Sequence, residues 1–198
     1  MSVADNVSRE TIARLEAYAK LLVQWNPKIN LVSKSTISDL WERHMEDSLQ
    51  IAELHPLRGN WADLGSGAGF PGLPLAIVGD DPTFHMSLIE ADARKSVFLR
   101  QALRITDTKA DVIDQRIEDT EPLQASRVTA RALAQLSDLL AFAHRHLAPN
   151  GQAVFLKGET WRSEIDAAKS SWSFEYDVHP SKTHSGSVIL TIGEIARV

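Results

Sequence analysis

One short segment constrains the fold of this chain more than any other. Residues 61–64 read as a short buried strand and lead directly into the glycine-rich loop of residues 65–72. Alternating glycines let a backbone turn tightly and approach a ligand, because no Cβ stands in the way. Ligands of open α/β sheets bind beyond the carboxyl ends of the strands, where such a loop leads into a helix. We therefore expect a ligand site here, and the alternative is a glycine-rich turn with no ligand.

The pattern after residue 60 predicts a parallel sheet covered on both faces, because strands alternate with helices. The final two strands have no helix between them, so we expect an antiparallel pair. Together these features predict an α/β Rossmann-like fold of the class I S-adenosylmethionine-dependent methyltransferase type, with a seven-stranded, mostly parallel sheet and a C-terminal antiparallel hairpin. The expected strands are 61–64, 84–90, 109–113, 127–130, 152–156, 174–178 and 188–195, and the expected helices are 92–104, 137–147 and 159–169.

The first part of the chain predicts a helical extension. Residues 8–25 carry apolar side chains at helical spacing, with Ser8 as the cap and Asn26-Pro27 as the break. A second helix is expected from Ile37 to Leu54, with Thr36 and Asp39 spaced as in a capping box. We expect residues 1–58 to form a helical cap within the same compact unit as a methyltransferase domain at 59–198.

Composition narrows the possible chemistry. The chain has 198 residues, is 43% hydrophobic and has no cysteine, so it can bury a core but has no disulfide, thiolate zinc site or thiol nucleophile. We expect no metal. The polar first ten residues do not resemble a secretory signal, and no apolar run is long enough to span a membrane. The expected protein is a cytoplasmic monomer.

The glycine pattern favours one ligand over another. The stretch from Gly67 to Gly72 satisfies the dinucleotide pattern, but it begins two residues too late after the strand and places Phe70-Pro71 where a pyrophosphate would meet the helix. Asp63 followed by Gly65, Gly67 and Gly69 instead suits S-adenosylmethionine, which has no pyrophosphate. Its amino-acid end can meet the loop backbone, with Asp63 near the ammonium group.

Two further segments are expected to hold this cofactor. Glu90 ends the second strand, where a carboxylate can accept hydrogen bonds from both ribose hydroxyls. The alternative is an ordinary surface acid. The segment after the third strand should border the adenine, with backbone groups of Ile117 and Glu118 at the base edge.

Missing residues restrict the acceptor of the methyl group. After the fourth strand the chain lacks the Asp or Asn with Pro-Pro-Tyr that serves exocyclic base amines, and no Cys is present to attack a pyrimidine. Guanine N7 has an exposed lone pair and needs alignment rather than a base. Arg131 suits guanine O6 or phosphate, unless it forms a structural salt bridge. Arg116 and Lys157 are expected to contact the substrate with it. Although the net charge is −5, these cations lie near strand ends and can line one rim.

The chain resembles the RsmG family, also called glucose-inhibited division protein B, from about residue 18 to 192. The resemblance implies methyl transfer from S-adenosylmethionine to N7 of a guanine in bacterial 16S ribosomal RNA, acting on the RNA or on the small ribosomal subunit. It also implies cofactor contacts at Gly65, Phe70, Ile117, Glu118 and Arg131. The matching residues are Trp25-Asn26, Asn30-Leu31-Val32-Ser33, Arg43-His44 with Asp47-Ser48, 63–74, Lys95 with Phe98-Leu99, Arg116-Ile117-Glu118, Arg131-Ala132 and Leu156-Lys157-Gly158.

Some roles stay open at this point. His44 and Asp47 lie three residues apart on one expected helix, so they can form a local structural pair, cover the cofactor or approach the substrate. A methyltransferase acting on another RNA, a protein or a small molecule is the rival enzyme. The rival without activity is an RNA-binding or nucleotide-sensing module with a vestigial site.

Overall fold

The computed structural model describes residues 7–198, so the first six residues of the polar N-terminus and of the expected 1–58 cap lie outside the described residues. Seven strands form one sheet in the order β3-β2-β1-β4-β5-β7-β6. The strands are β1 (Asn60–Leu64), β2 (His85–Ile89), β3 (Asp111–Ile113), β4 (Ala125–Arg131), β5 (Leu147–Lys157), β6 (Trp172–Pro180) and β7 (Val188–Arg197).

The sheet is parallel except at β7, which runs antiparallel to both of its neighbours, β5 and β6. The expected C-terminal antiparallel hairpin is therefore confirmed. The helical elements are α1 (Arg9–Ile29), η2 (Lys34–Thr36), η3 (Trp41–Glu46), α2 (Asp47–Leu54), α3 (Gly72–Val78), α4 (Ala93–Ile105), α5 (Leu136–His146) and α6 (Trp161–Ala168).

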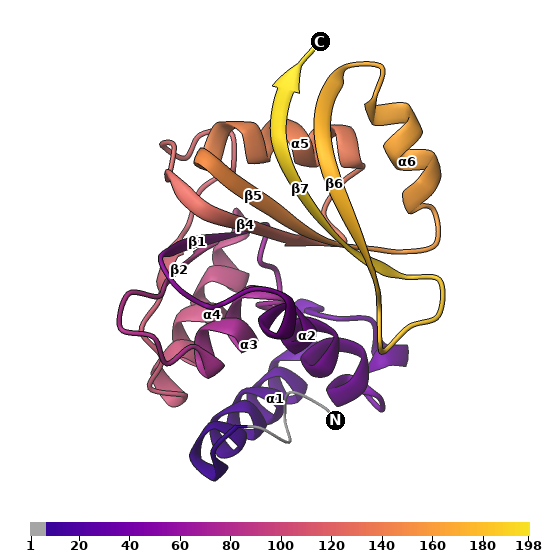
Figure 1. Cartoon of the computed structure of the whole chain (residues 1–198). Coiled ribbons are helices and arrows are strands. Elements are labelled where there is room, and N and C mark those ends of the chain that lie inside the picture. Colours follow the sequence, from indigo (N-terminus) through magenta and orange to yellow (C-terminus); the bar gives the residue numbers. More distant parts are fainter. Residues whose placement is uncertain (1–6) are drawn as a thin grey trace.

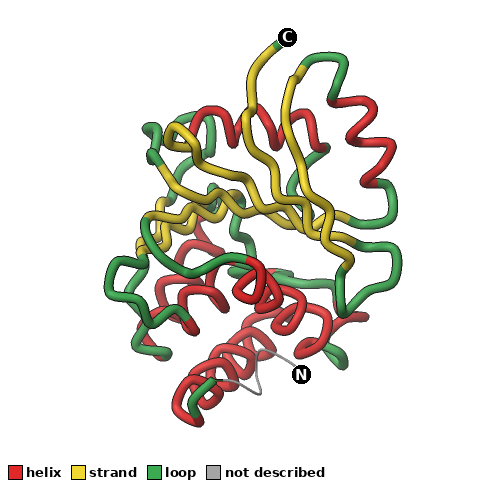
Figure 2. Tube along the Cα trace, viewed as in Figure 1, coloured by secondary structure: helices red, strands yellow, loops and turns green. Residues whose placement is uncertain are grey.

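Helices cover both faces of the sheet, as Figures 1 and 2 show. On one face α1, α2, α3 and α4 share a buried cluster that includes Leu22, Trp61 and Leu88. On the other face α5 and α6 pack on Ala62 and Phe155. Neighbouring strand residues such as Trp61 and Ala62 thus pack against the helices on opposite faces of the sheet, because successive side chains of a strand point to opposite sides.

The first helix is longer than expected. The Ser8 hydroxyl accepts a hydrogen bond from the Thr11 N–H, as expected of the cap, but Pro27 lies inside the helix. The expected break at Asn26-Pro27 is wrong, because a proline so close to the helix end removes few backbone bonds. The helix ends instead at Ile29, and its C-cap residue Asn30 has a left-handed backbone with φ of 48°.

The second expected helix is also wrong in detail. Residues 37–54 do not form one α-helix, because a π-helix, η3, precedes α2. Thr36 caps no helix by the expected box, and its hydroxyl donates to the Ser33 carbonyl over 2.8 Å. The π-turn brings His44 and Asp47 toward the carboxyl end of β4, where both contact Arg131.

Candidate active site

The loop after β1 has a backbone that glycine alone adopts readily. Gly65, Gly67 and Gly69 have positive φ angles of 60°, 57° and 103°. A Cβ on Gly67 would have open space around it, with the Gly65 carbonyl oxygen as its nearest contact at 3.7 Å. A Cβ on Gly69 would come within 2.9 Å of the Tyr18 hydroxyl. Gly67 therefore borders free space, whereas Gly69 serves the packing of α1 under the loop.

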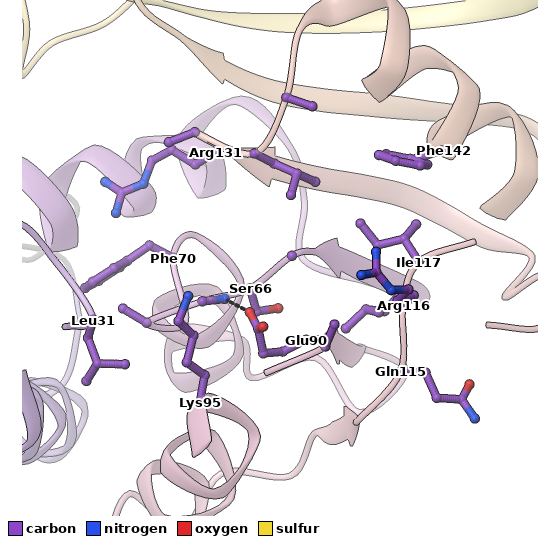
Figure 3. A pocket seen from close by; sticks show the side chains of 18 of the residues that line it. Leu31, Ser66, Phe70, Glu90, Lys95, Gln115, Arg116, Ile117, Arg131 and Phe142 are labelled. Carbon is purple, nitrogen blue, oxygen red and sulfur yellow. Dashed lines mark hydrogen bonds between the residues drawn. The ribbon is translucent and has the colours of Figure 1, made fainter. Parts of the chain in front are cut away.

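A cavity of about 510 Å³ lies beyond the carboxyl ends of β1, β2 and β4, within the size range of small-molecule sites. Figure 3 shows Arg131 above the Phe70 ring on one side, with Arg116 and Ile117 on the other. The sequence-predicted residues that line it are Gly65, Gly67, Phe70, Glu90, Arg116, Ile117, Glu118 and Arg131.

Glu90 braces the glycine loop as well as lining the cavity. Its Oε2 atom accepts a hydrogen bond from the Gly67 N–H over 2.7 Å, and Oε1 accepts one from the Asp92 N–H over 2.7 Å. An ionised carboxylate has about four acceptor positions. Each oxygen thus keeps room for one more donor, so Glu90 can hold the loop and a ligand hydroxyl at once.

Asp63 lies outside the cavity, contrary to the expected place beside an ammonium group. Its side chain is fully buried, and a Cβ on Gly72 would come within 2.6 Å of the Asp63 Cβ. The alternation of β1 therefore directs Asp63 toward α3 rather than toward the ligand site. Its Oδ1 accepts from the Thr129 hydroxyl over 2.7 Å, and burial raises the pKa of this carboxyl to about 6.

Lys157, which was expected to contact the substrate, is held in a buried ion pair. Its Nζ atom lies 2.6 Å from Glu164 Oε2 and donates to the Ala134 carbonyl over 3.1 Å. Both side chains are largely buried, at 11% and 8% exposure. Lys157 lines a second, smaller cavity rather than the first. Its partner Glu164 lies in the first turn of α6, and sequence reasoning gave no reason to pair them.

The segment after β3 forms the wall opposite Phe70. Ile117 is buried, and its carbonyl oxygen lies 3.0 Å from His146 Nε2. The side chains of Arg116 and Glu118 are exposed at the rim. Backbone and apolar groups of this segment thus face the cavity while its charges face solvent.

Arg131 lies at the wall shared by the two cavities. Its Nη1 donates to the Arg43 carbonyl over 3.1 Å and to Asp47 Oδ2 over 3.3 Å, and its Nη2 lies 2.8 Å from His44 Nδ1. The guanidinium carbon stands 4.8 Å above the centre of the Phe70 ring. These bonds use three of the five guanidinium N–H donors, which leaves two for a ligand.

His44 accepts the hydrogen bond from Arg131. The Thr36 hydroxyl donates to Ser33, so it accepts from His44 Nε2 over 2.9 Å, and the opposite ring nitrogen is left as an acceptor. Burial and the charge of Arg131 lower the pKa of His44 to about 4. A neutral imidazole of fixed tautomer results, stacked on Phe70 with ring centres 5.0 Å apart.

Three further lining residues were not assigned to the site from the sequence. Lys95, which the family resemblance includes, projects toward the cavity from α4, as Figure 3 shows. Leu31 and Phe142 add apolar surface from distant parts of the chain, for which no local pattern exists. Within residues 7–198, no group of three or more His, Asp or Glu side chains is placed to hold a metal ion.

Solved structures share this architecture. A transferase from Pyrococcus horikoshii superposes with a TM-score of 0.62 at 14% identity, covering 87% of this chain and 67% of its own. TYW2 of M. jannaschii, solved in complex with AdoMet, gives 0.61 at 17% identity, covering 87% and 80%. The strand order, the antiparallel β7 and the glycine loop define a class I S-adenosylmethionine-dependent methyltransferase fold.

Sequence relatives identify the family within that class. The family model described as rRNA small subunit methyltransferase G matches residues 11–189. Proteins named ribosomal RNA small subunit methyltransferase G are 48% identical in Gluconobacter oxydans, over 97% of this chain and 98% of theirs, and 46% identical in a Ruegeria species, over 98% and 95%. The chain belongs to the rRNA small subunit methyltransferase G family.

Among the described residues, no helix is long and apolar enough to cross a membrane.

Proposed function

We propose that this protein transfers the methyl group of S-adenosylmethionine to N7 of a guanine in 16S ribosomal RNA. The observation that carries the proposal is the position of Arg131 between two cavities. One cavity has the glycine loop and Glu90, and the other has Arg43 and Lys157 among its lining residues. Donor and acceptor can therefore meet beside one guanidinium group, which borders both cavities.

The residues of the first cavity fit the cofactor. Free space at Gly67 admits its amino-acid end, and the spare acceptor positions of Glu90 suit two ribose hydroxyls. The backbone of Ile117 and Glu118 borders the place for the adenine. When bound, S-adenosylmethionine supplies a methyl group on a positively charged sulfur.

The residues of the second cavity need only align the acceptor, and they need not remove a proton from it. Guanine N7 offers a lone pair and has no proton to lose, so the chain need not supply a general base. Arg131 keeps two free donors for guanine O6 or a phosphate oxygen. Arg43 and Arg116 are exposed and available to RNA phosphates.

The test is transfer of a labelled methyl group to purified 16S ribosomal RNA and to small ribosomal subunits, followed by nuclease digestion and nucleoside analysis. We expect label in N7-methylguanosine with at least one of the two substrates. Label on adenine, on a protein or on a small molecule would instead favour the rival methyltransferases.

We further propose that the protein acts as a cytoplasmic monomer and that residues 1–58 cap the domain at 59–198. Sedimentation of the purified chain tests the proposed monomer.

A further inference from the structure

The loop that joins β6 to β7, residues 181–187, is fastened to α2. The Lys182 N–H donates to Gln50 Oε1 over 3.0 Å, and the Lys182 side chain forms an ion pair with Glu53. Thr183 Oγ1 lies 2.9 Å from Asp47 Oδ1. In Figure 1 this loop reaches down from the C-terminal strands to the helices at the start of the chain.

Asp47 is the point at which this loop meets the active site. Its Oδ1 accepts from Gln50 Nε2 over 2.9 Å and from the Thr183 hydroxyl, which fills both acceptor positions of that oxygen. Its Oδ2 faces Arg131 Nη1 at 3.3 Å. The carboxylate is 15% exposed and Arg131 is 16% exposed, so water competes little for these bonds.

The orientation of Asp47 determines where Arg131 points. A carboxylate held on one oxygen by two donors presents its other oxygen in one direction. Arg131 also meets His44 Nδ1 and the Arg43 carbonyl, so three acceptors fix its guanidinium above Phe70, and Asp47 is the charged one among them. Small displacements of a group that aligns a reacting atom reduce the rate substantially.

We infer that Thr183 is a positioning residue for methyl transfer. Through Asp47 it fixes the guanidinium of Arg131 at the wall between the two cavities, although Thr183 lies far from β4 in sequence. The inference rests on the proposed function for the identity of the methyl acceptor only. Removal of the hydroxyl should slow the transfer step, because Arg131 then loses its single orientation, and it should leave the cofactor cavity unchanged.

The experiment compares Thr183→Val, Thr183→Ser and Lys182→Gln in the full-length protein. We expect Thr183→Val to lower kcat about tenfold, the loss typical of one hydrogen bond to a charged group. Thr183→Ser should restore most of the rate, because it keeps the hydroxyl. Lys182→Gln removes the neighbouring exposed ion pair with Glu53 and should behave as the parent protein.

Cofactor affinity and thermal stability, measured beside kcat, distinguish a positioning role from general damage to the structure. For Thr183→Val, the Kd for S-adenosylmethionine should match that of the parent within twofold, and the melting temperature should match within a few degrees. A Thr183→Val protein with parental kcat, or a Thr183→Ser protein as slow as Thr183→Val, would overturn the inference. An equal loss of cofactor binding would overturn it too, by showing a structural role. Gln50→Met removes the other donor to Asp47 Oδ1 and should also lower kcat.

The role inferred for Thr183 can be tested even if the methyl acceptor differs from the one proposed. If the parent protein methylates another RNA or a small molecule, the three variants are compared with that acceptor, because the geometry of Arg131 is independent of the acceptor. A parent protein that binds S-adenosylmethionine but transfers its methyl to none of these acceptors contradicts both proposals.

Discussion

At the scale of single residues, Gly67 and Glu90 act as one unit. The Gly67 N–H is bonded to the Glu90 carboxylate while its Cα faces open space. The same carboxylate that we assign to the ribose therefore also shapes the loop. A substitution at either position should reduce cofactor affinity more than it reduces the stability of the fold.

Gly67→Ala should weaken S-adenosylmethionine binding at least tenfold, because the added methyl group stands in the cavity. Its positive φ costs about 1 to 2 kcal/mol as well. Gly59→Ala is the matched control, since Gly59 has φ of 70° at the opposite end of β1, where a Cβ would meet only the Ser126 side chain. Calorimetric titration with melting curves checks both. Equal affinity in the two variants would show that the cofactor does not approach Gly67.

Asp63 should make stability depend on pH. Its folded pKa of about 6 exceeds the ordinary 3.8, so the folded state binds the proton more tightly and stability falls as pH rises from about 4 to 6. About two pKa units correspond to about 3 kcal/mol. Asp63→Asn lacks this ionisation, so its stability relative to the parent should be about 3 kcal/mol more favourable at pH 7 than at pH 3.5. Urea unfolding at both pH values measures this difference, and a difference that is constant with pH would contradict the cause given.

At the scale of elements, local patterns predicted most of the fold. The cap at Ser8 is confirmed, because capping depends on residues within one turn. The seven strands and their final hairpin are confirmed as well. The π-helix η3 was missed, because its turn serves contacts of His44 and Asp47 with β4 that lie far away in sequence.

The candidate site was likewise predictable where it depends on strand ends and on the glycine loop. The loop residues Gly65 and Gly67 and the strand ends Glu90 and Arg131 line the cavity, since the topology alone places strand ends together. The position of Asp63 against α3 and the pairing of Lys157 with Glu164 were not predicted, because they depend on Gly72 and Glu164 in elements that local reasoning treats separately.

Glu164 joins three elements and should be important for stability. It accepts from the Leu136 N–H at the start of α5 and from the Thr160 hydroxyl beside α6, and it pairs with Lys157 on β5. Glu164→Ala leaves a buried lysine unpaired and should destabilise by about 3 to 5 kcal/mol. The exposed Asp166, 4.0 Å from Lys169, is the control, and its replacement by Ala should change stability by less than about 0.5 kcal/mol. Chemical denaturation separates the two, and similar losses would argue against a buried pair.

At the scale of the whole molecule, the helices before β1 belong to the main core. Leu15, Tyr18 and Leu22 of α1 share a buried cluster with α3, α4 and the sheet. The Tyr18 hydroxyl also donates to the Ala68 carbonyl of the glycine loop over 2.5 Å. The first helix thus supports the cofactor loop from beneath.

Leu22→Ala should therefore destabilise the entire protein rather than one part. The loss of a fully buried leucine costs about 2 to 5 kcal/mol. Tryptophan fluorescence and far-UV circular dichroism should report one coincident transition at a lower denaturant concentration. Two separate transitions would show that the N-terminal helices unfold on their own. Val23→Ala, at a neighbouring exposed position, should change the midpoint little.

The link between the loop at 181–187 and α2 has a consequence for how the protein is made. Residues from both ends of the chain, Thr36 and His184 among them, line the second cavity. A nascent chain that already contains the glycine loop and Arg131 still lacks the loop that holds Asp47 through Thr183. The second cavity is therefore complete only after the β6–β7 hairpin has been synthesised and its loop has packed against α2.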